Sequence, residues 1–165
     1  MDNEAYAEWL VKRKSPAYAM PLKVLMAVLC AVGLFLALTT MLGIIALVLA
    51  VAAAYFVFRS LNVEFEYLYV TGQLTIDKIM GKSKRKKAWE GSMEEIQIIA
   101  PADSYVLKDY ETSNMKLLDF STHGEHAKVF ALISRTGGET VKILFEPNEK
   151  MLRCFKMTSP RKVVQ

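Results

Sequence analysis

The sequence VLMAVLCAVGLFLALTTMLGIIALVLAVAAAYFVF occupies residues 24–58 and contains no Asp, Glu, Lys, Arg or His. A helix that crosses the hydrocarbon core of a bilayer needs about 20 apolar residues. This run is therefore too long for one crossing and, with its flanks, just long enough for two. Its most polar stretch, residues 39–43, lies near its middle. We predict a two-helix transmembrane hairpin within residues 16–59, with helices at about 20–38 and 42–58.

The charges that flank this run indicate its orientation. The basic residues beside the expected helices are Lys12, Arg13, Lys14, Lys23 and Arg59, whereas the loop between the helices carries no charge. Because cytoplasmic flanks of membrane helices are enriched in Lys and Arg, we expect a multi-pass protein of the cytoplasmic (plasma) membrane with both termini in the cytoplasm. A cleaved signal peptide is not expected, since its apolar region spans only about 7–15 residues.

Residues 1–15 are predicted to form an amphipathic helix that lies in the membrane interface. Tyr6, Trp9 and Leu10 would share one face of this helix, and Pro16 would end it. A Trp-bearing helix with basic residues next to a membrane is typical of interfacial helices.

Small residues recur at helical spacing along the apolar run, for example at Ala46, Ala50 and Ala54. Such stripes let helices approach closely in lipid. We expect them to pack the two helices of the hairpin together; a homo-oligomer or a contact with a partner's helix is the alternative. The run has no ionisable residue at mid-membrane depth, which argues against a transporter or a proton relay.

Residues 60–165 are predicted to form a cytoplasmic, mainly β domain. Alternating apolar and polar residues follow Arg59, and Thr71–Gly72 is typical of a hairpin turn. Similar patterns predict seven strands, at residues 63–70, 74–79, 84–90, 94–100, 116–121, 128–135 and 140–145. A final helix is expected to begin at Pro147, since Pro is favoured at the first helical position.

Four strands, then three strands, then a helix is an order that resembles a pleckstrin-homology-like (PH-like) barrel. FEYLYV (65–70), QLTI (73–76) and EIQII (95–99) are similar to segments of the bacterial PH domains that follow paired transmembrane helices. Through APADSYVLKDY (100–110) and FEPNEKM (145–151), the whole chain resembles a family of bacterial two-helix membrane proteins of unknown function. The resemblance implies a seven-stranded antiparallel PH-like barrel with a C-terminal helix, and it implies no activity.

A cluster of basic residues marks the third expected strand. Its members are Lys82, Lys84, Arg85, Lys86 and Lys87. Each positive charge near an anionic membrane contributes about 1 kcal/mol of attraction, so we predict that this strand orients the domain on the bilayer or holds a lipid headgroup. The alternative is a solvated edge whose lysines discourage strand pairing. Nucleic acid is not an expected partner, because the net charge is only +4 and only Trp89 supplies an aromatic ring near the cluster.

The connection at residues 101–114 is unusually long for a compact domain. It contains Asp103, Tyr105, Lys108, Asp109 and Tyr110. Long loops of this kind are often functional. We predict that it either binds a protein partner or folds over the domain with its tyrosines buried.

The sequence predicts no catalytic, cofactor or metal site. His123 and His126 share one expected turn without a third metal ligand, and no base accompanies a Ser or Cys nucleophile. Cys30 and Cys154 are expected to remain unpaired. We predict a membrane-anchored, non-enzymatic interaction module at the inner leaflet that binds a protein partner or anionic lipid headgroups. The alternative is an accessory subunit that joins a larger membrane complex through its helices.

Overall fold

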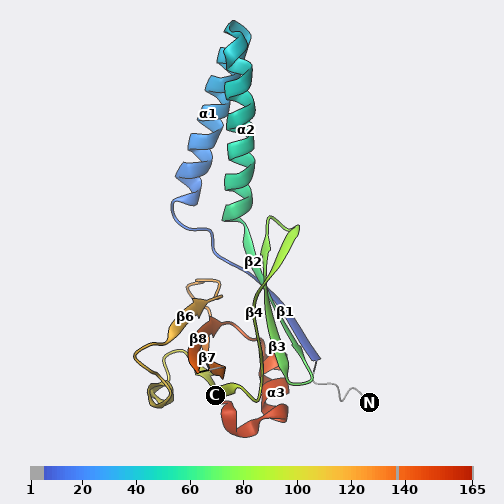
Figure 1. The fold of residues 1–165 in the computed structure, drawn as a ribbon, viewed down its shortest axis with the longest axis vertical. Helices are drawn as coiled ribbons and strands as arrows, with labels where there is room; N and C mark the ends of the chain where they lie inside the picture. Colours follow the sequence, from blue (N-terminus) through green and yellow to red (C-terminus); the bar gives the residue numbers. More distant parts are fainter. Residues whose placement is uncertain (1–5, 137, 165) are drawn as a thin grey trace. The chain divides into compact units, whose positions relative to one another are not determined.

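The computed structural model describes residues 6–136 and 138–164, and the chain divides into two compact units. One unit comprises the chain up to Lys14, Glu64–Ile79 and the chain from Arg85 onward. The other comprises Ser15–Val63 and Met80–Lys84. Figure 1 shows the elements of both units in chain order. We refer to them as the β unit and the helical unit.

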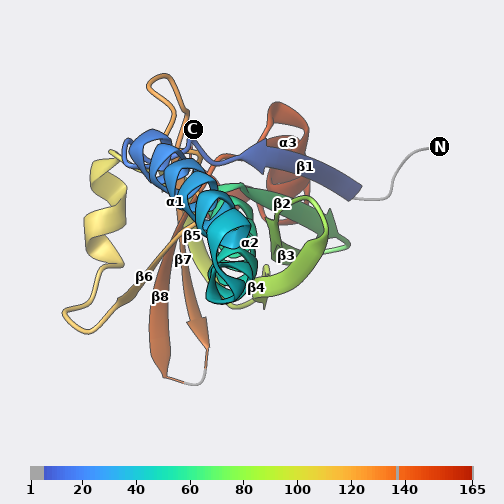
Figure 2. The same ribbon diagram turned by 90° about the horizontal axis from the view of Figure 1, so that it is seen from above.

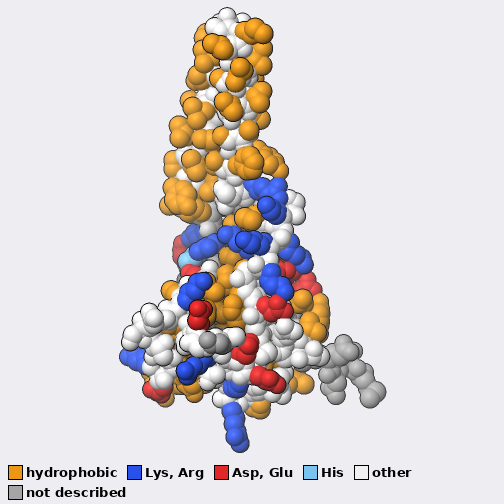
Figure 3. Space-filling view, in the orientation of Figure 1, with side chains coloured by type: hydrophobic (Ala, Val, Ile, Leu, Met, Phe, Trp, Pro, Cys, Tyr) orange, Lys and Arg blue, Asp and Glu red, His pale blue; other side chains and the backbone are white. Residues whose placement is uncertain are grey.

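The helical unit contains the predicted helix pair. Helix α1 spans Ala19–Thr39 and helix α2 spans Met41–Leu61. Their mean hydropathies are 2.4 and 2.7, and both are long and apolar enough to cross a membrane. Apolar side chains cover the length of the pair in Figure 3. Each helix begins one residue before its predicted start. Helix α1 ends one residue later than predicted, and α2 ends three residues later.

The turn between the helices is as short as the polar stretch of the sequence suggested. Thr40 is extended, and its side-chain oxygen accepts a hydrogen bond of 3.1 Å from the Gly43 amide. A Cβ atom on Gly43 would lie 2.1 Å from the carbonyl carbon of Leu36. Only a glycine therefore allows the second helix to begin so close to the end of the first.

Two four-stranded sheets make up most of the β unit. The first has the order β1-β2-β3-β4 and the second the order β5-β7-β8-β6. The strands are β1 (Tyr6–Lys12), β2 (Val63–Val70), β3 (Gln73–Met80), β4 (Lys84–Ser92), β5 (Ile96–Pro101), β6 (Lys116–Asp119), β7 (Phe130–Thr136) and β8 (Glu139–Phe145). The other elements are helix α3 (Glu149–Thr158) and the short 3-10 helices η1 (Tyr105–Asp109) and η2 (Pro160–Lys162).

The predicted N-terminal amphipathic helix is wrong over the described part of residues 1–15; residues 1–5 lie outside the described residues. The segment Tyr6–Lys12 is strand β1, which pairs antiparallel with β2. An isolated helix of about 15 residues or fewer is marginal, whereas Tyr, Trp and Val favour strands. Pairing with β2 also buries Ala7 and Val11 in the β unit.

The predicted seven-stranded antiparallel barrel also needs correction. The described chain has eight strands in two sheets that do not close into a barrel, and β6 runs parallel to β8. The fourth predicted strand, 94–100, corresponds to β5 and joins the second sheet by pairing with β7. The fourth strand of the first sheet is instead β1, which lies next to β2. The choice of sheet depends on contacts between distant segments, which strand periodicity does not reveal.

Aromatic rings build the centre of the β unit. Tyr67 packs on Phe145 with ring centroids 5.7 Å apart, and Tyr69 packs on Phe155 at 4.8 Å. Phe155 belongs to α3, whose N-cap Asn148 accepts a hydrogen bond of 2.8 Å from the Met151 amide. Helix α3 therefore begins just after Pro147 rather than at it, and its buried face completes the core.

Replacing Phe155, which is 0% exposed, by Ala tests this packing. We expect Phe155→Ala to lower the free energy of unfolding by about 3–5 kcal/mol, because it removes the ring that joins α3 to the sheets. Met157→Ala on the same helix is the matched control, since Met157 is 69% exposed. Thermal unfolding of the full chain in detergent, followed by near-ultraviolet circular dichroism, measures the difference. Equal stability of the two variants would contradict the packing described.

Candidate functional site

The helical unit ends in a group of positive charges. Arg59 lies in the last turn of α2, and its guanidinium donates to the Tyr55 hydroxyl at 2.8 Å. Lys23 lies near the start of α1, at the same end of the antiparallel pair as Arg59. Lys82 and Lys84 belong to the segment between β3 and β4 that is part of this unit. We call Lys23, Arg59, Lys82 and Lys84 the basic end.

A close backbone contact holds the β3–β4 turn against the end of α2. The Gly81 amide donates to the Asn62 carbonyl at 2.9 Å. A Cβ atom on Gly81 would lie 2.7 Å from Cγ of Arg59, and Gly81 has a positive φ of 58°. Because the turn fits only with glycine at this position, Lys82 and Lys84 are fixed beside the last turn of α2.

The five predicted headgroup residues fall into two groups. Arg85 forms an ion pair of 2.8 Å with Glu66, whose side chain is 10% exposed, and lies 3.9 Å from Asp77. Lys87 pairs with Glu90, and this hydrogen bond raises the pKa of the Lys87 ammonium. Among the described residues, Lys82, Lys84 and Lys86 have no carboxylate partner. Arg85 and Lys87 therefore have carboxylate partners in the sheet, and the other three offer unpaired charge.

The predicted partner-binding loop is anchored at one residue and exposed at the others. Leu107 in η1 is 2% exposed and packs in a cluster with Ile98 and Ile133. Tyr105 is 80% exposed and Tyr110 is 39% exposed, so the prediction of buried tyrosines is wrong. The remaining members of the predicted loop site are Asp103, Lys108 and Asp109, which are also exposed.

A hollow lies beside the start of this loop. It has a volume of about 500 Å³ and is lined by Pro101, Ala102, Asp103, Ala127, Lys128, Val129 and Phe130. Asp103 of the predicted loop site lines this hollow. Its lining combines one acidic and one basic side chain with apolar surface.

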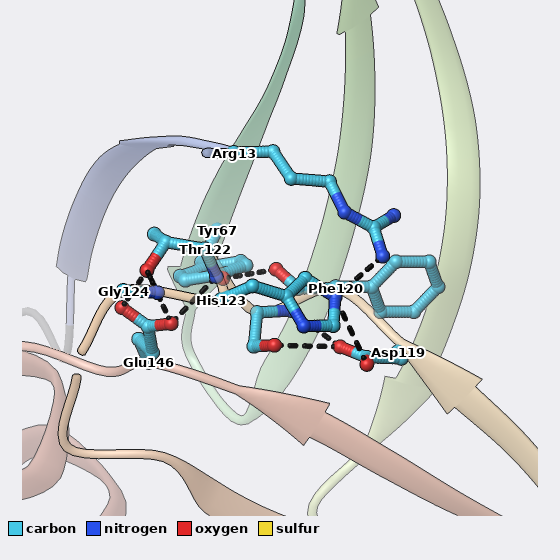
Figure 4. A network of polar contacts seen from close by, with 9 residues as sticks. Arg13, Tyr67, Asp119, Phe120, Thr122, His123, Gly124 and Glu146 are labelled. Carbon is cyan, nitrogen blue, oxygen red and sulfur yellow. Dashed lines mark hydrogen bonds and ion pairs between the residues drawn. The ribbon is translucent and has the colours of Figure 1, made fainter. Parts of the chain in front are cut away.

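A polar network that the sequence did not suggest joins three segments of the β unit (Figure 4). The Glu146 carboxylate accepts hydrogen bonds from the Thr122 amide at 2.5 Å and from the Thr122 hydroxyl at 2.7 Å. The Tyr67 hydroxyl donates to the Phe120 carbonyl at 2.7 Å, and burial raises the pKa of the Tyr67 phenol. These contacts hold the segment after β6 against both sheets.

The network also reaches the segment that follows β1. The Arg13 guanidinium lies 2.5 Å from Nε2 of His123, and the Lys14 amide donates to the Thr122 carbonyl at 2.7 Å. The Lys14 ammonium pairs with Glu125 at 2.7 Å. The chain is therefore fixed to the β unit up to Lys14, the last residue before the helical unit begins.

Ser121, Asp119 and His123 lie together in this network, but their order of contact differs from that of a nucleophilic triad. The Ser121 hydroxyl donates to Asp119 at 2.7 Å, and His123 lies 3.2 Å from the other oxygen of Asp119. A triad requires the histidine between the serine and the carboxylate. In residues 6–136 and 138–164, no group of three His, Cys, Asp or Glu side chains is placed to hold a metal.

The small residues of α2 divide between two faces of the helix. Ala54 is 8% exposed and Ala50 is half-buried, whereas Ala46 is exposed. A Cβ atom on Gly33 of α1 would lie 3.1 Å from Cα of Leu47, so the backbones approach closely there. Ala50 and Ala54 thus belong with Leu47 to the face that packs on α1, and Ala46 does not.

The two kinds of basic residue in β4 can be separated experimentally. We expect Arg85→Gln to lower the free energy of unfolding by about 1–3 kcal/mol, because Glu66 loses its partner in a nearly buried position. Lys86→Gln, one residue away, should change it by less than about 0.5 kcal/mol. Denaturant unfolding followed by tryptophan fluorescence measures both. A larger loss in Lys86→Gln than in Arg85→Gln would show that the Glu66 pair is unimportant.

Comparisons with known proteins agree with this architecture. The family model Bacterial PH-like domain (DUF6106) matches residues 3–165. No curated protein and no solved structure matches the chain. The two sheets and α3 form the PH-like region, and the match extends across both long helices. The chain belongs to this family of bacterial PH-like domains of unknown function.

Proposed function

We propose that this protein is a membrane-anchored interaction module whose helix pair spans the cytoplasmic membrane with both termini in the cytoplasm. The basic end binds anionic lipid headgroups, and the β unit presents its loops to a protein partner at the inner leaflet. This function requires no chemistry from the domain.

The observation that carries the proposal is the position of Lys82 and Lys84. The Gly81–Asn62 hydrogen bond makes their turn part of the helical unit, next to Arg59. In a membrane, the last turn of α2 would reach the headgroup region, where Lys and Arg are favoured. Lys82 and Lys84 therefore contact headgroups because their turn is packed on the end of α2, and this contact does not depend on the position of the β unit.

The exposed loop around η1 supports the second half of the proposal. Tyr105 and Tyr110 supply large amphipathic surfaces, and Asp103 borders the hollow. Exposed tyrosines are enriched where proteins bind one another. The alternative function, assembly into a larger complex through Ala46, Ala50 and Ala54, is less favoured because two of these residues face α1.

The anchoring is tested by removing the helices without cutting the sheet. Lys12 lies opposite Glu64 across β1 and β2, so a short Gly/Ser linker can replace residues 15–62. We expect the full chain to stay in the membrane pellet after an alkaline wash and the shortened chain to be soluble. Release of the full chain by the wash would disprove membrane spanning.

Headgroup binding is tested with the full chain in detergent. Native mass spectrometry would compare binding of phosphatidylglycerol with that of phosphatidylcholine. We expect Lys82→Gln/Lys84→Gln to weaken phosphatidylglycerol binding about tenfold and to leave phosphatidylcholine binding unchanged, since each lysine contributes about 1 kcal/mol or somewhat less.

The control is a double variant that loses two positive charges from the β unit instead of the basic end. Lys116 and Lys128 are exposed residues of the β unit, and Lys116→Gln/Lys128→Gln should bind phosphatidylglycerol like the unchanged protein. Equal weakening in both double variants would mean that binding follows net charge, and the basic end would then not be a headgroup site.

A further inference from the structure

Strand β1 is an edge strand of the first sheet (Figure 2). Thr71 and Gly72 both have positive φ and form a two-residue turn between Val70 and Gln73. Residues that flank such a turn bond to each other, so Val70 directs its N–H and C=O toward β3. Tyr6, opposite Val70, must then point outward, and the alternation along a strand extends this to Glu8, Leu10 and Lys12.

The contacts around β1 agree with this assignment. Sγ of Cys154 in α3 lies 3.9 Å from the Tyr6 carbonyl oxygen, and the Lys150 ammonium lies 5.7 Å from the Tyr6 ring centre. Helix α3 thus shields the outer edge at Tyr6. Within the described chain, no backbone or side-chain hydrogen bond engages the outward amides and carbonyls of Glu8, Leu10 and Lys12.

The other three sheet edges carry features that discourage pairing. Edge strand β4 bears a run of basic side chains, which repel a second copy. Strand β5 is covered by the C-terminal segment, where the Val164 amide donates to the Ile99 carbonyl at 2.9 Å. Strand β6 has only four residues. Strand β1 is shielded by α3 at Tyr6, but the outward backbone groups of Glu8, Leu10 and Lys12 have no hydrogen-bond partner among the described residues. Trp9 is 42% exposed and Leu10 is 51% exposed.

The charges of β1 are self-complementary about Leu10. In antiparallel pairing of two copies centred on this residue, Glu8 of each copy faces Lys12 of the other, and Trp9 of each faces Val11 of the other. Oppositely charged and apolar cross-strand pairs both stabilise a sheet. The same register makes Glu8, Leu10 and Lys12 the hydrogen-bonded positions, which are the ones whose backbone groups point outward.

We propose that two copies of this chain form a symmetric dimer by pairing their β1 strands over residues 8–12. The two first sheets then continue into one sheet of eight strands, and the exposed parts of Trp9 and Leu10 become covered. The interface is isologous, so it closes after two copies. It involves the β unit alone and is independent of lipid binding and of the small residues in the helices.

A charge exchange tests the register. We expect Glu8→Lys and Lys12→Glu each to raise the dimer dissociation constant of the full chain in detergent at least about tenfold, because each replaces two attractive cross-strand pairs by repulsive ones. The double variant Glu8→Lys/Lys12→Glu restores opposite charges and should return to within about threefold of the unchanged protein. Both Glu8 variants lose the hydrogen bond from the Tyr6 hydroxyl, so the rescue separates pairing from local damage.

Cross-linking in membranes gives a second, independent measurement. In a chain with Cys30→Ala and Cys154→Ala, Leu10→Cys places two thiols at a pair whose Cα atoms are about 5.5 Å apart, within the range for a disulfide. Met157→Cys, at an exposed position on α3, is the control and should not cross-link. Sedimentation of the full chain in detergent measures the dissociation constants.

A protein that stays monomeric up to about 100 μM would overturn the proposal. A dimer whose dissociation constant is unchanged in the single charge variants would also overturn it. So would a double variant whose dissociation constant is as high as that of the single variants. A dimer that persists in the charge variants but is lost in Ala46→Leu would place the interface on the helices instead. Cross-linking through Leu10 together with charge rescue would establish the β1 interface.

Discussion

The pairing of β1 with β2 is the constraint on which the rest of the structure depends. The two strands are adjacent and antiparallel, with Lys12 opposite Glu64, yet the whole helix pair lies between them in the chain. Closing so long a connection costs conformational entropy. Two helices of 21 residues each, joined by one extended residue, reduce that cost because they return the chain to its starting end. In this sense the helix pair is a long, ordered insertion in a β-hairpin.

Arg13 and Lys14 show how the insertion is joined to the domain. Both follow β1 directly and bond to the segment after β6. On the return side, Asn62 accepts a hydrogen bond from Gly81 in the β3–β4 turn. The chain is thus held by the domain before the first helix and by a β-turn after the second. Basic residues near membrane helices usually report only topology; here Arg13 and Lys14 also have structural partners.

The helices and most strands were predicted correctly from the sequence, whereas the contacts between distant segments were not. The helices follow from the length of the uncharged run, and β2 and β3 follow from alternation around Thr71–Gly72, since both signals lie within one segment. Tyr6, Trp9 and Leu10 fit one face of a helix and also fit a strand, so pairing with β2 decided between them. The network around Glu146 joins residues from distant segments, and no local signal could have assembled it. Arg85 and Lys86 are equivalent in the sequence, but only Arg85 finds a carboxylate across the sheet.

The error at the N-terminus and the unprotected edge of the first sheet have the same origin. Trp9 and Leu10 suggested burial in a membrane interface because apolar residues beside basic ones are typical of that setting. In the strand, β2 pairs with one backbone edge of this segment, and α3 contacts the other edge at Tyr6. An apolar edge strand is normally selected against because it promotes association. Strands β4, β5 and β6 are protected by charge, by the C-terminal segment and by their short length, respectively. The open part of the β1 edge is therefore best explained as the interface of the proposed dimer.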